Sequence, residues 1–363
     1  MQYRAIGLMS GSSCDGLDIA FIHLEEARGV WQFEIVHADC IPYTAIWKEK
    51  LLGADALSAL DFQYLHHEYG AYTGALVKEF IAKHALEYKV QLIGSHGHTV
   101  FHEPTKGISI QAGSGAAIAA ATGINVISDL RSMDTALGGQ GAPIVPIGEQ
   151  ALFADYDYCL NIGGISNLSI KKDGNWLAWD ICAANRVLNA LASTQNRSFD
   201  AEGKIAASGK LNTALLTKLN ELGYYQQQPP KSLNNSFGDD EVLRIIQHAS
   251  IDTADALHTY CRHIAQQILY SILPNAINQA PAKMLVTGGG AFNSFLMQCI
   301  LKELQTIPIS ISIPDATVIQ YKEALIMGFL AVLRWREEYT CHAASTGAIR
   351  NSIGGAVWMG QEA

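Results

Sequence analysis

Residues 7–24, GLMSGSSCDGLDIAFIHL, contain the feature from which the fold is inferred, a polar, glycine-rich turn between two apolar strands. The expected strands are Ala5–Met9 and Leu17–Leu24, the second rich in β-branched and aromatic residues. Backbone N–H groups in such a turn bind phosphate oxygens, and the carboxylates of Asp15 and Asp18 are ligands that Mg²⁺ prefers. The segment therefore predicts a phosphate-binding hairpin with a magnesium ion, and an ordinary hairpin turn is the alternative.

The same pattern of three strands occurs twice along the chain. The second copy has the glycine-rich turn GGIS between its first two strands. A chain of 363 residues is long enough for two domains. We therefore expect a duplicated α/β fold with two lobes and an interdomain cleft. The expected strands are Ala5–Met9, Leu17–Leu24 and Trp31–Ala38 in the first copy, and Tyr158–Ile162, Asn167–Lys171 and Trp176–Ile181 in the second. The expected divisions are an N-terminal lobe (1–150), a C-terminal lobe (151–340) and a tail (341–363).

Composition excludes several kinds of partner. The net charge is −9 and no Lys/Arg-rich run is present, which argues against a nucleic-acid partner. The seven cysteines form no CxxC pair and most lie in apolar surroundings, as in proteins of a reducing compartment. The N-terminus lacks the features of a signal peptide, and we expect no transmembrane helix. A cytoplasmic protein without a membrane or nucleic-acid partner is predicted.

A run of three glycines, Gly288, Gly289 and Gly290, follows an expected strand and precedes an expected helix. Glycines at such a place let a ligand approach the backbone and leave the helix N-terminus uncovered. We expect a nucleotide base or ribose there, although a tight strand-to-helix turn is the alternative. The chain has no GxxxxGK[ST] motif and is therefore not a P-loop protein.

Several polar residues are further candidates. His96, His98 and His102 would share one face of a strand, which suits either a metal or, as we favour, hydrogen bonding at a cleft wall. Asp180 ends an expected strand and is either a general base or a helix cap. Arg131 and Asp134 are also candidates, and the alternative is that they form a solvated ion pair in a loop. Glu323 lies at the start of an expected helix, Lys322–Arg336. Its alternative role is a favourable interaction of its charge with the helix dipole.

Taken in order, these motifs resemble the anhydro-N-acetylmuramic acid kinase family from Gly7 to about Trp358. The glycine turns alone would indicate only the larger group of actin-like ATPases. The matching segments are GLMSGSSCDGLD, IGSHGHTVFHEP, ATGINVISDLR, GGQGAPIVP, NIGGISNLS, FDAEGKIAASG, PPKS, TGGGAFNSFLM, KEALIMGFLA and TGAIRNSIGGA.

The resemblance implies a two-lobed actin-like ATPase fold, which is a duplicated ribonuclease H-like fold, and a reaction. ATP with Mg²⁺ would phosphorylate 1,6-anhydro-N-acetylmuramic acid, a product of cell-wall recycling, while water opens its anhydro bridge. The product would be N-acetylmuramic acid 6-phosphate. A homodimer is also implied by the family.

The resemblance further assigns expected roles to residues. It implies that Asp180 is the general base that activates water. Near the sugar it implies Arg131, Glu323, His96 and Asn185. For ATP it implies the first turn (Gly11, Ser12, Ser13, Cys14, Asp15, Gly16, Leu17, Asp18), the second hairpin (Asn161, Gly163, Gly164) and the adenosine side (Gly288, Gly289, Gly290, Asn293).

The chain departs from the family pattern near the expected base. The family's D-x-G-P-x-N is here Asp180 to Asn185 with Cys182-Ala183 in place of Gly-Pro, and F-R-R-R-D keeps one arginine, Arg131. The family's SHGQT is here SHGHT, with His98 in place of glutamine. A kinase for another amino sugar is therefore a second hypothesis, and a non-catalytic sugar or nucleotide sensor is a third.

Overall fold

The computed structural model describes residues 1–11, 14–172, 175–229, 231–233, 236–275 and 281–360. These residues form two compact units. The first consists of residues 1–154 and 321–363, and the second of residues 155–320. The first expected boundary, at residue 150, lies close to the observed one. Residues 321–340, which we expected in the C-terminal lobe, belong instead to the first unit, as does the tail, because helix α12 packs on the first sheet.

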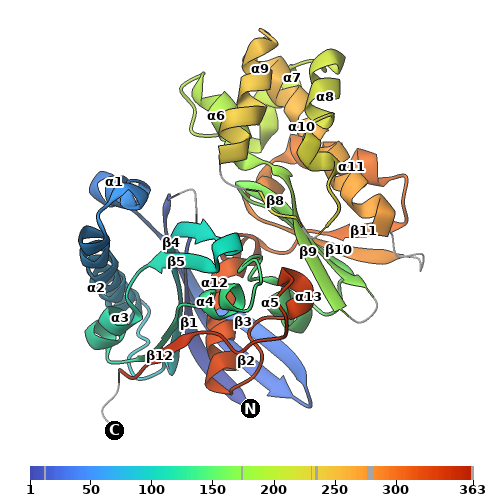
Figure 1. Ribbon diagram of the computed structural model, residues 1–363. Coiled ribbons are helices and arrows are strands. Elements are labelled where there is room, and N and C mark those ends of the chain that lie inside the picture. Colours follow the sequence, from blue (N-terminus) through green and yellow to red (C-terminus); the bar gives the residue numbers. More distant parts are fainter. Residues whose placement is uncertain (12–13, 173–174, 230, 234–235, 276–280, 361–363) are drawn as a thin grey trace. The chain divides into compact units, whose positions relative to one another are not determined.

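The first unit is built on one mixed sheet with the strand order β12-β6-β4-β1-β2-β3, and β5 pairs with β4 (Figure 1). The neighbours β1, β2 and β3 are antiparallel, whereas β1 pairs with β4, and β4 with β6, in parallel. The strands are β1 (Gln2–Ser10), β2 (Gly16–Ala27), β3 (Val30–Pro42), β4 (Leu92–Glu103), β5 (Ile108–Ala112), β6 (Asn125–Ser128) and β12 (Ala356–Trp358).

The sheet of the second unit has the order β11-β10-β7-β8-β9. Its first three strands are again antiparallel, and its two later strands again join in parallel. The order is thus that of β6-β4-β1-β2-β3, so the predicted duplicated α/β fold is confirmed. The strands are β7 (Tyr158–Ile162), β8 (Ile165–Lys172), β9 (Asn175–Ala183), β10 (Ala282–Thr287) and β11 (Ile309–Ser312).

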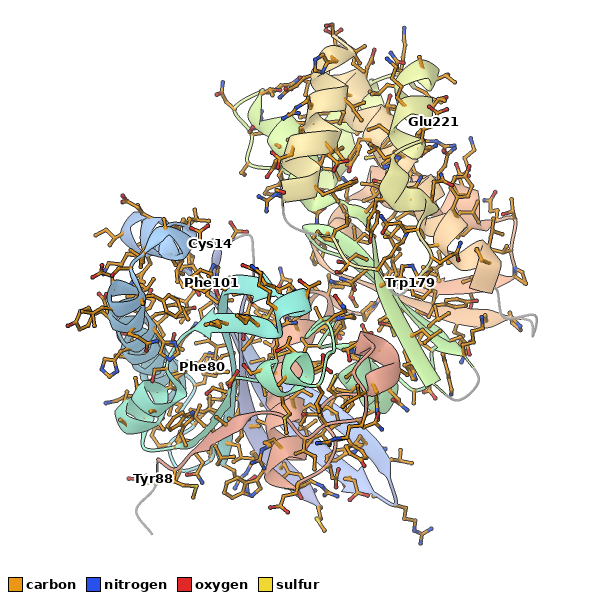
Figure 2. All side chains as sticks on the ribbon, in the orientation of Figure 1. Cys14, Phe80, Tyr88, Phe101, Trp179 and Glu221 are labelled. Carbon is orange, nitrogen blue, oxygen red and sulfur yellow. The ribbon has the colours of Figure 1, made fainter. Side chains whose placement is uncertain are left out.

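Helices cover both faces of the first sheet (Figure 1). Helix α2 packs with α3 over one face, where Phe80 is buried (Figure 2). Helix α12 lies on the other face, where an added Cβ on Gly7 or Gly94 would meet its backbone oxygens at 1.7 Å and 2.1 Å. The helices are α1 (Ala45–Leu52), α2 (Ala59–Lys83), α3 (Gly115–Thr122), α4 (Ser132–Ala136), α5 (Pro146–Leu152), α12 (Ala316–Trp335) and α13 (Ala343–Thr346).

Helix α12 has the length and composition of a membrane-spanning helix, the only one among the described residues to do so. Two-thirds of its most apolar window, 67%, is nevertheless buried inside the protein. Its close contact with the glycines of β1 and β4 explains that composition, because a helix between a sheet and other elements is apolar on most sides. We therefore interpret α12 as a core helix.

The second unit has one large apolar core, which includes Trp179 of β9 (Figure 2). Helix α10 packs in this core. Its buried residues recur at helical spacing from Ala256 to Ile272. The helices are α6 (Asn185–Ser193), α7 (Lys204–Ser208), α8 (Thr213–Asn220), α9 (Arg244–His248), α10 (Thr253–Ile272) and α11 (Ser294–Leu304).

Candidate active site

The first glycine-rich turn joins β1 to β2, and its described residues are held by backbone hydrogen bonds. The Cys14 N–H donates to the Gly11 carbonyl at 3.1 Å, and the Tyr43 N–H donates to the Asp15 carbonyl at 3.1 Å. Cys14 has a left-handed backbone (φ 53°) and a buried side chain. Ser12 and Ser13 lie outside the described residues. The backbone of this turn is therefore shaped by contacts of the first unit itself.

Two residues that we expected to bind ATP have structural roles here. An added Cβ on Gly16 would meet the Ile41 carbonyl oxygen at 2.5 Å, so this glycine allows β2 to approach β3. The Leu17 side chain is buried in the apolar core of the first unit. Only the backbone of Leu17 remains for a contact with a nucleotide.

Acidic side chains lie together beside this turn. The pKa of Asp18 is raised to about 6, mainly by burial and also by the negative charges of Glu323 and Asp15, although a hydrogen bond with Cys40 opposes the rise. Among the described residues, no group of three or more His, Cys, Asp or Glu side chains is arranged to hold a metal. Mg²⁺ commonly takes one or two carboxylates and completes its shell with waters and substrate phosphates. The donor set of Asp15 and Asp18 fits that kind of site.

The half-buried Arg131 and the buried His96 form a polar pair in the first unit. The Arg131 Nε–H donates to His96 Nε2 at 2.9 Å, and the Arg131 Nη1–H donates to the Gly141 carbonyl. Burial and the Arg131 charge lower the pKa of His96 to about 3. The imidazole is therefore neutral, its Nε2 accepts, and its Nδ1–H donates to the Gly97 carbonyl at 2.9 Å.

The three histidines do not act as one set of ligands. A left-handed Gly97 (φ 74°) and a register shift between Thr99 and Phe101 break the alternation of β4 that we expected. His98 pairs with the Ser10 hydroxyl at 2.9 Å, and His102 with the Ser109 hydroxyl at 3.1 Å. The hydrogen-bonding interpretation is therefore the one that the structure supports.

Two alternative interpretations from the sequence were wrong. Arg131 and Asp134 are not a solvated pair, because Asp134 is buried and accepts hydrogen bonds from the Gly141 N–H and the Thr346 hydroxyl. Glu323 does not begin a helix, because α12 starts at Ala316. Burial raises the pKa of Glu323, while the charges of Lys322 and Arg131 lower it.

In the second unit, the glycine turns lie against each other. Gly288 has a left-handed backbone (φ 82°), and an added Cβ there would meet Asn161 Oδ1 at 2.6 Å and the Ile162 carbonyl carbon at 2.7 Å. The start of α6 is tied to the hairpin, because the Asn185 side-chain amide donates to the Ile162 carbonyl at 2.9 Å. The predicted hairpin, the α6 N-terminus and the triple glycine are therefore brought together.

Gly290 and Gly164 of this cluster have different surroundings. An added Cβ on Gly290 would meet the Ile162 side chain at 2.2 Å, so that glycine is required for packing. Nothing lies within 4 Å of an added Cβ on Gly164. Gly164 therefore faces open space, as a residue that leaves room for a ligand would.

Asn293, expected on the adenosine side, caps a helix. Its Oδ1 accepts the Leu296 N–H at 2.9 Å, and an added Cβ on Gly203 would meet the same oxygen at 2.2 Å. Asn293 Oδ1 thus already accepts a hydrogen bond within the unit, and the FDAEGK segment packs against it. Sequence reasoning missed this interpretation, although Asn is a common helix cap.

Asp180 lies on β9 and is half-buried. Its Oδ2 accepts one hydrogen bond, from the Leu233 N–H at 2.8 Å, and its backbone carbonyl accepts the Tyr224 hydroxyl at 2.7 Å. Burial raises the pKa of Asp180 to about 6, and the Leu233 N–H opposes that rise. Its helix-cap alternative is wrong, since the N-cap position of α6 is Ala184.

The surroundings of Asp180 contain residues that the sequence did not identify. Lys231 lies with its Nζ 4.5 Å from the centre of the Tyr224 ring and donates to the Tyr224 carbonyl at 3.2 Å. The substituted residue Cys182 is fully buried, and the Ala183 carbonyl accepts the Tyr260 hydroxyl at 2.7 Å. The Cys-Ala pair is thus packed into the unit behind Asp180. No sequence signal singled out Tyr224, since it lies in a polar stretch.

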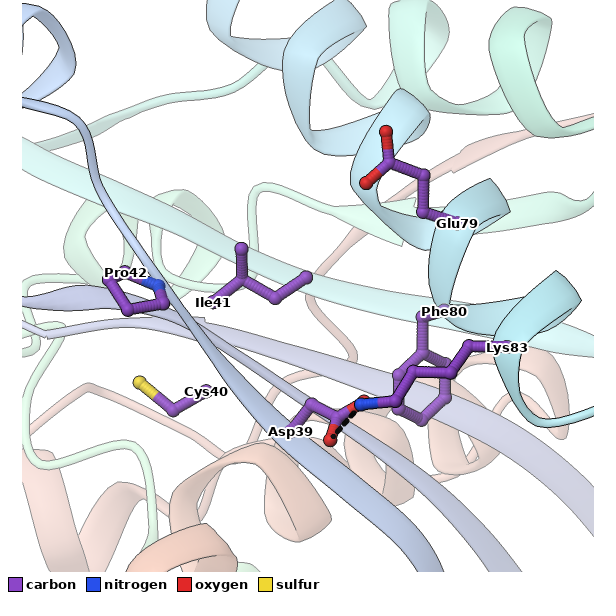
Figure 3. A pocket seen from close by; sticks show the side chains of 7 residues that line it. All are labelled: Asp39, Cys40, Ile41, Pro42, Glu79, Phe80 and Lys83. Atoms are coloured by element: carbon purple, nitrogen blue, oxygen red, sulfur yellow. Dashed lines mark hydrogen bonds and ion pairs between the residues drawn. The ribbon is translucent and has the colours of Figure 1, made fainter.

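A surface pocket between β3 and α2 holds none of these residues (Figure 3). Of its three charged residues, Asp39 and Lys83 pair with each other at 2.9 Å, and the third, Glu79, is negative. The pocket therefore offers little uncompensated positive charge to a phosphate. Its lining residues are Asp39, Cys40, Ile41, Pro42, Glu79, Phe80 and Lys83.

The duplicated fold and its glycine-lined turns define a two-unit α/β protein of the actin-like ATPase class. The family model of anhydro-N-acetylmuramic acid kinase matches residues 3–360. An anhydro-N-acetylmuramic acid kinase of Hydrogenovibrio crunogenus is 30% identical over 97% of each chain, and one of Vibrio cholerae is 32% identical over 97% of each. A solved activator of 2-hydroxyisocaproyl-CoA dehydratase from Clostridium difficile, with bound ADPNP, is 15% identical with a TM-score of 0.44, over 92% of this chain and 96% of that one. The chain belongs to the anhydro-N-acetylmuramic acid kinase family, a family of ATP-dependent sugar kinases, as the sequence predicted.

Proposed function

We propose that this chain is the ATP-dependent kinase that converts 1,6-anhydro-N-acetylmuramic acid into N-acetylmuramic acid 6-phosphate. The observation that supports the proposed chemistry is the environment of the Asp180 carboxylate. Its carboxylate is half-buried, accepts one backbone hydrogen bond and has a pKa raised to about 6. A general base is most effective when its pKa lies near the working pH.

The chemistry of this sugar explains the need for a base. O6 of the anhydro sugar is part of the bridge and carries no proton, so a simple transfer to a hydroxyl is not available. Water adds to C1, the C1–O6 bond breaks, and O6 takes the γ-phosphoryl group of ATP. Asp180 accepts the proton that the water loses, and ADP is the second product. We assign the water to Asp180 Oδ1, to which no described residue is found to hydrogen-bond.

The phosphates of ATP are assigned to backbone N–H groups of the turn Gly11–Asp18 and of the Gly163–Gly164 hairpin. The open space beside Gly164 supports the second assignment. Asp15 and Asp18 would hold Mg²⁺, which would neutralise phosphate charge. Gly288 and Gly289 would lie beside the adenosine. We assign no side-chain contact with ATP to Asn293, because its oxygen caps α11.

The sugar is assigned to Arg131, His96, Glu323 and Asn185. N-acetylmuramic acid carries a carboxylate, and a guanidinium is the side chain that pairs best with such a group. The neutral His96 fixes the Nε of Arg131. Arg131 and Glu323 also attract each other, since each charge shifts the pKa of the other toward its ionised form.

The test is the turnover of two sugars by the purified chain with ATP and Mg²⁺. We expect 1,6-anhydro-N-acetylmuramic acid to yield the 6-phosphate much faster than N-acetylmuramic acid, whose O6 is a free hydroxyl. Faster turnover of the free sugar would support the second hypothesis, a kinase for another amino sugar. The Cys182-Ala183 substitution behind Asp180 is the observation that favours it. Binding of either ligand without ATP consumption would favour a sensor.

We also propose that the enzyme works in the cytoplasm. All seven cysteines are free thiols, which suits a reducing compartment. A homodimer, which the resemblance implies, remains a prediction, and sedimentation analysis of the purified chain would test it.

A further inference from the structure

Asp134 is a buried carboxylate in α4 that binds both the loop at Gly141 and the distant segment 341–346 of the first unit. Its Oδ2 accepts the Gly141 N–H at 2.7 Å. Its Oδ1 accepts the Thr346 hydroxyl at 2.7 Å and the Cys341 thiol at 3.2 Å. Its side chain is 3% exposed. Such hydrogen bonds to a charged acceptor are stronger than those between neutral groups.

The Gly141 peptide connects Asp134 to Arg131. The N–H of Gly141 is bound by Asp134, and its carbonyl accepts the Arg131 Nη1–H. The loop leaves little freedom here, because Gly141 is left-handed (φ 63°) and an added Cβ would meet Thr135 at 2.6 Å. Arg131 is thus held on one side by His96 and on the other by a carbonyl whose position depends on Asp134.

The C-terminal segment closes over the same loop. The Gln140 N–H donates to the Thr346 carbonyl at 2.9 Å, and the Ile349 N–H donates to the Leu137 carbonyl at 3.1 Å. Thr346 therefore binds the loop through its backbone and Asp134 through its hydroxyl. The family's tail motif, TGAIRNSIGGA, begins at this threonine.

We propose that Asp134 is a positioning residue for Arg131, and that the C-terminal segment acts on sugar binding through it. This inference rests on the proposed function, in which Arg131 binds the sugar. A buried carboxylate is costly in a protein core, and hydrogen bonds from an N–H, an O–H and an S–H compensate for that cost. A purely structural loop could be closed with neutral groups. The charged acceptor instead fixes the one carbonyl that orients the guanidinium.

The experiment compares Asp134→Asn and Thr346→Val with the wild-type enzyme. We expect the KM for the anhydro sugar to rise about tenfold for Asp134→Asn, which corresponds to about 1.4 kcal/mol, and about threefold for Thr346→Val, which corresponds to about 0.7 kcal/mol. The KM for ATP should change less than about twofold, since no contact with the turns of ATP is altered. Asp129→Asn is the matched control, because Asp129 is an exposed acid two residues before Arg131 and should leave both KM values unchanged.

Thr346→Val keeps every charge, so it tests the inference even if Asp134→Asn folds poorly. Unchanged sugar KM values in both variants would overturn the inference. So would equal rises in both KM values together with a lower melting temperature, which is the pattern of a merely structural role. Failure of the wild-type enzyme to phosphorylate the sugar would instead contradict the proposed function.

Discussion

The Leu233 N–H donates to Asp180 Oδ2 at 2.8 Å and is the only described group found to hydrogen-bond that carboxylate. One backbone donor orients the carboxylate without fully compensating its charge, so burial still raises its pKa to about 6. An amide at this position would keep the hydrogen bond to Leu233 but could not accept a proton. The residue is therefore suited to a test that changes chemistry and little else.

Asp180→Asn should lower kcat at least a hundredfold, since general-base catalysis contributes about 10²- to 10⁴-fold. Affinity for a non-hydrolysable ATP analogue, measured by calorimetry, should stay within about twofold, because the glycine turns keep their contacts. The matched control is Glu221→Gln, an exposed acid of the same unit, which should leave kcat unchanged (Figure 2). Full turnover by Asp180→Asn would remove Asp180 from its proposed role.

The pH dependence of the reaction follows from the same pKa. A general base acts in its ionised form, so kcat/KM for the sugar should rise with pH through about 6 and level off above it. The profile should be measured at saturating MgATP, because the pKa of Asp18 is also raised to about 6 and bound Mg²⁺ would keep that carboxylate ionised. A profile that is flat between pH 5 and pH 8 would argue against a base with this pKa.

A buried ion pair, Lys322 with Glu149, gives a prediction about stability. Their Nζ–Oε1 distance is 2.7 Å, and the side chains are 2% and 0% exposed. Removal of one partner leaves a buried charge without its counter-ion, so Lys322→Met should lower the free energy of unfolding by about 3–5 kcal/mol. The double change Glu149→Leu with Lys322→Met should recover most of that loss, since an apolar pair of similar size suits the core.

Urea unfolding followed by circular dichroism measures both effects. Lys50→Met is the control, because the Lys50–Glu68 pair is exposed and such pairs contribute at most about 1 kcal/mol. If the double variant is as unstable as the single one, the loss comes from other contacts of Lys322 and not from the ion pair.

The sequence was sufficient to predict the six strands next to the two glycine-rich turns, because their apolar runs and glycine turns are local signals, whereas β12 in the tail was not predicted. Tyr158–Ile162 is observed with the predicted bounds, and the strand predicted at Asn167–Lys171 begins two residues earlier and ends one residue later. The start of α12 was placed too late, since residues 316–321 (ATVIQY) lack the continuous apolar run that follows Lys322. That error led to the wrong alternative interpretation for Glu323.

Side-chain roles could be predicted only where a motif matched a family. Asp134 was expected to be a solvated loop residue, but it accepts hydrogen bonds from Gly141 and Thr346. Asn293 was expected to contact the ligand, but it caps α11. The role of Asp134 depends on a partner far away in sequence, Thr346, whereas the cap at Asn293 is local and an Asn directly before the α11 sequence could have indicated it. Tyr224 and Leu233 contact Asp180 across more than 40 residues of chain, and no local pattern reports such contacts.

The two glycines Gly164 and Gly290 give a paired test of the nucleotide site. Gly164→Ala adds a methyl group where nothing lies within 4 Å, so the protein should fold with an unchanged melting temperature. If phosphate occupies that space, the KM for ATP should rise about tenfold or more, which corresponds to about 1.4 kcal/mol of lost binding. Gly290→Ala adds a methyl group 2.2 Å from the Ile162 side chain and should lower the melting temperature by several degrees, as overpacking costs about 1–3 kcal/mol. Gly290→Ala tests only packing, and its loss of melting temperature shows how large a structural effect in this cluster is. A normal KM for ATP in Gly164→Ala would show that the hairpin does not approach the nucleotide.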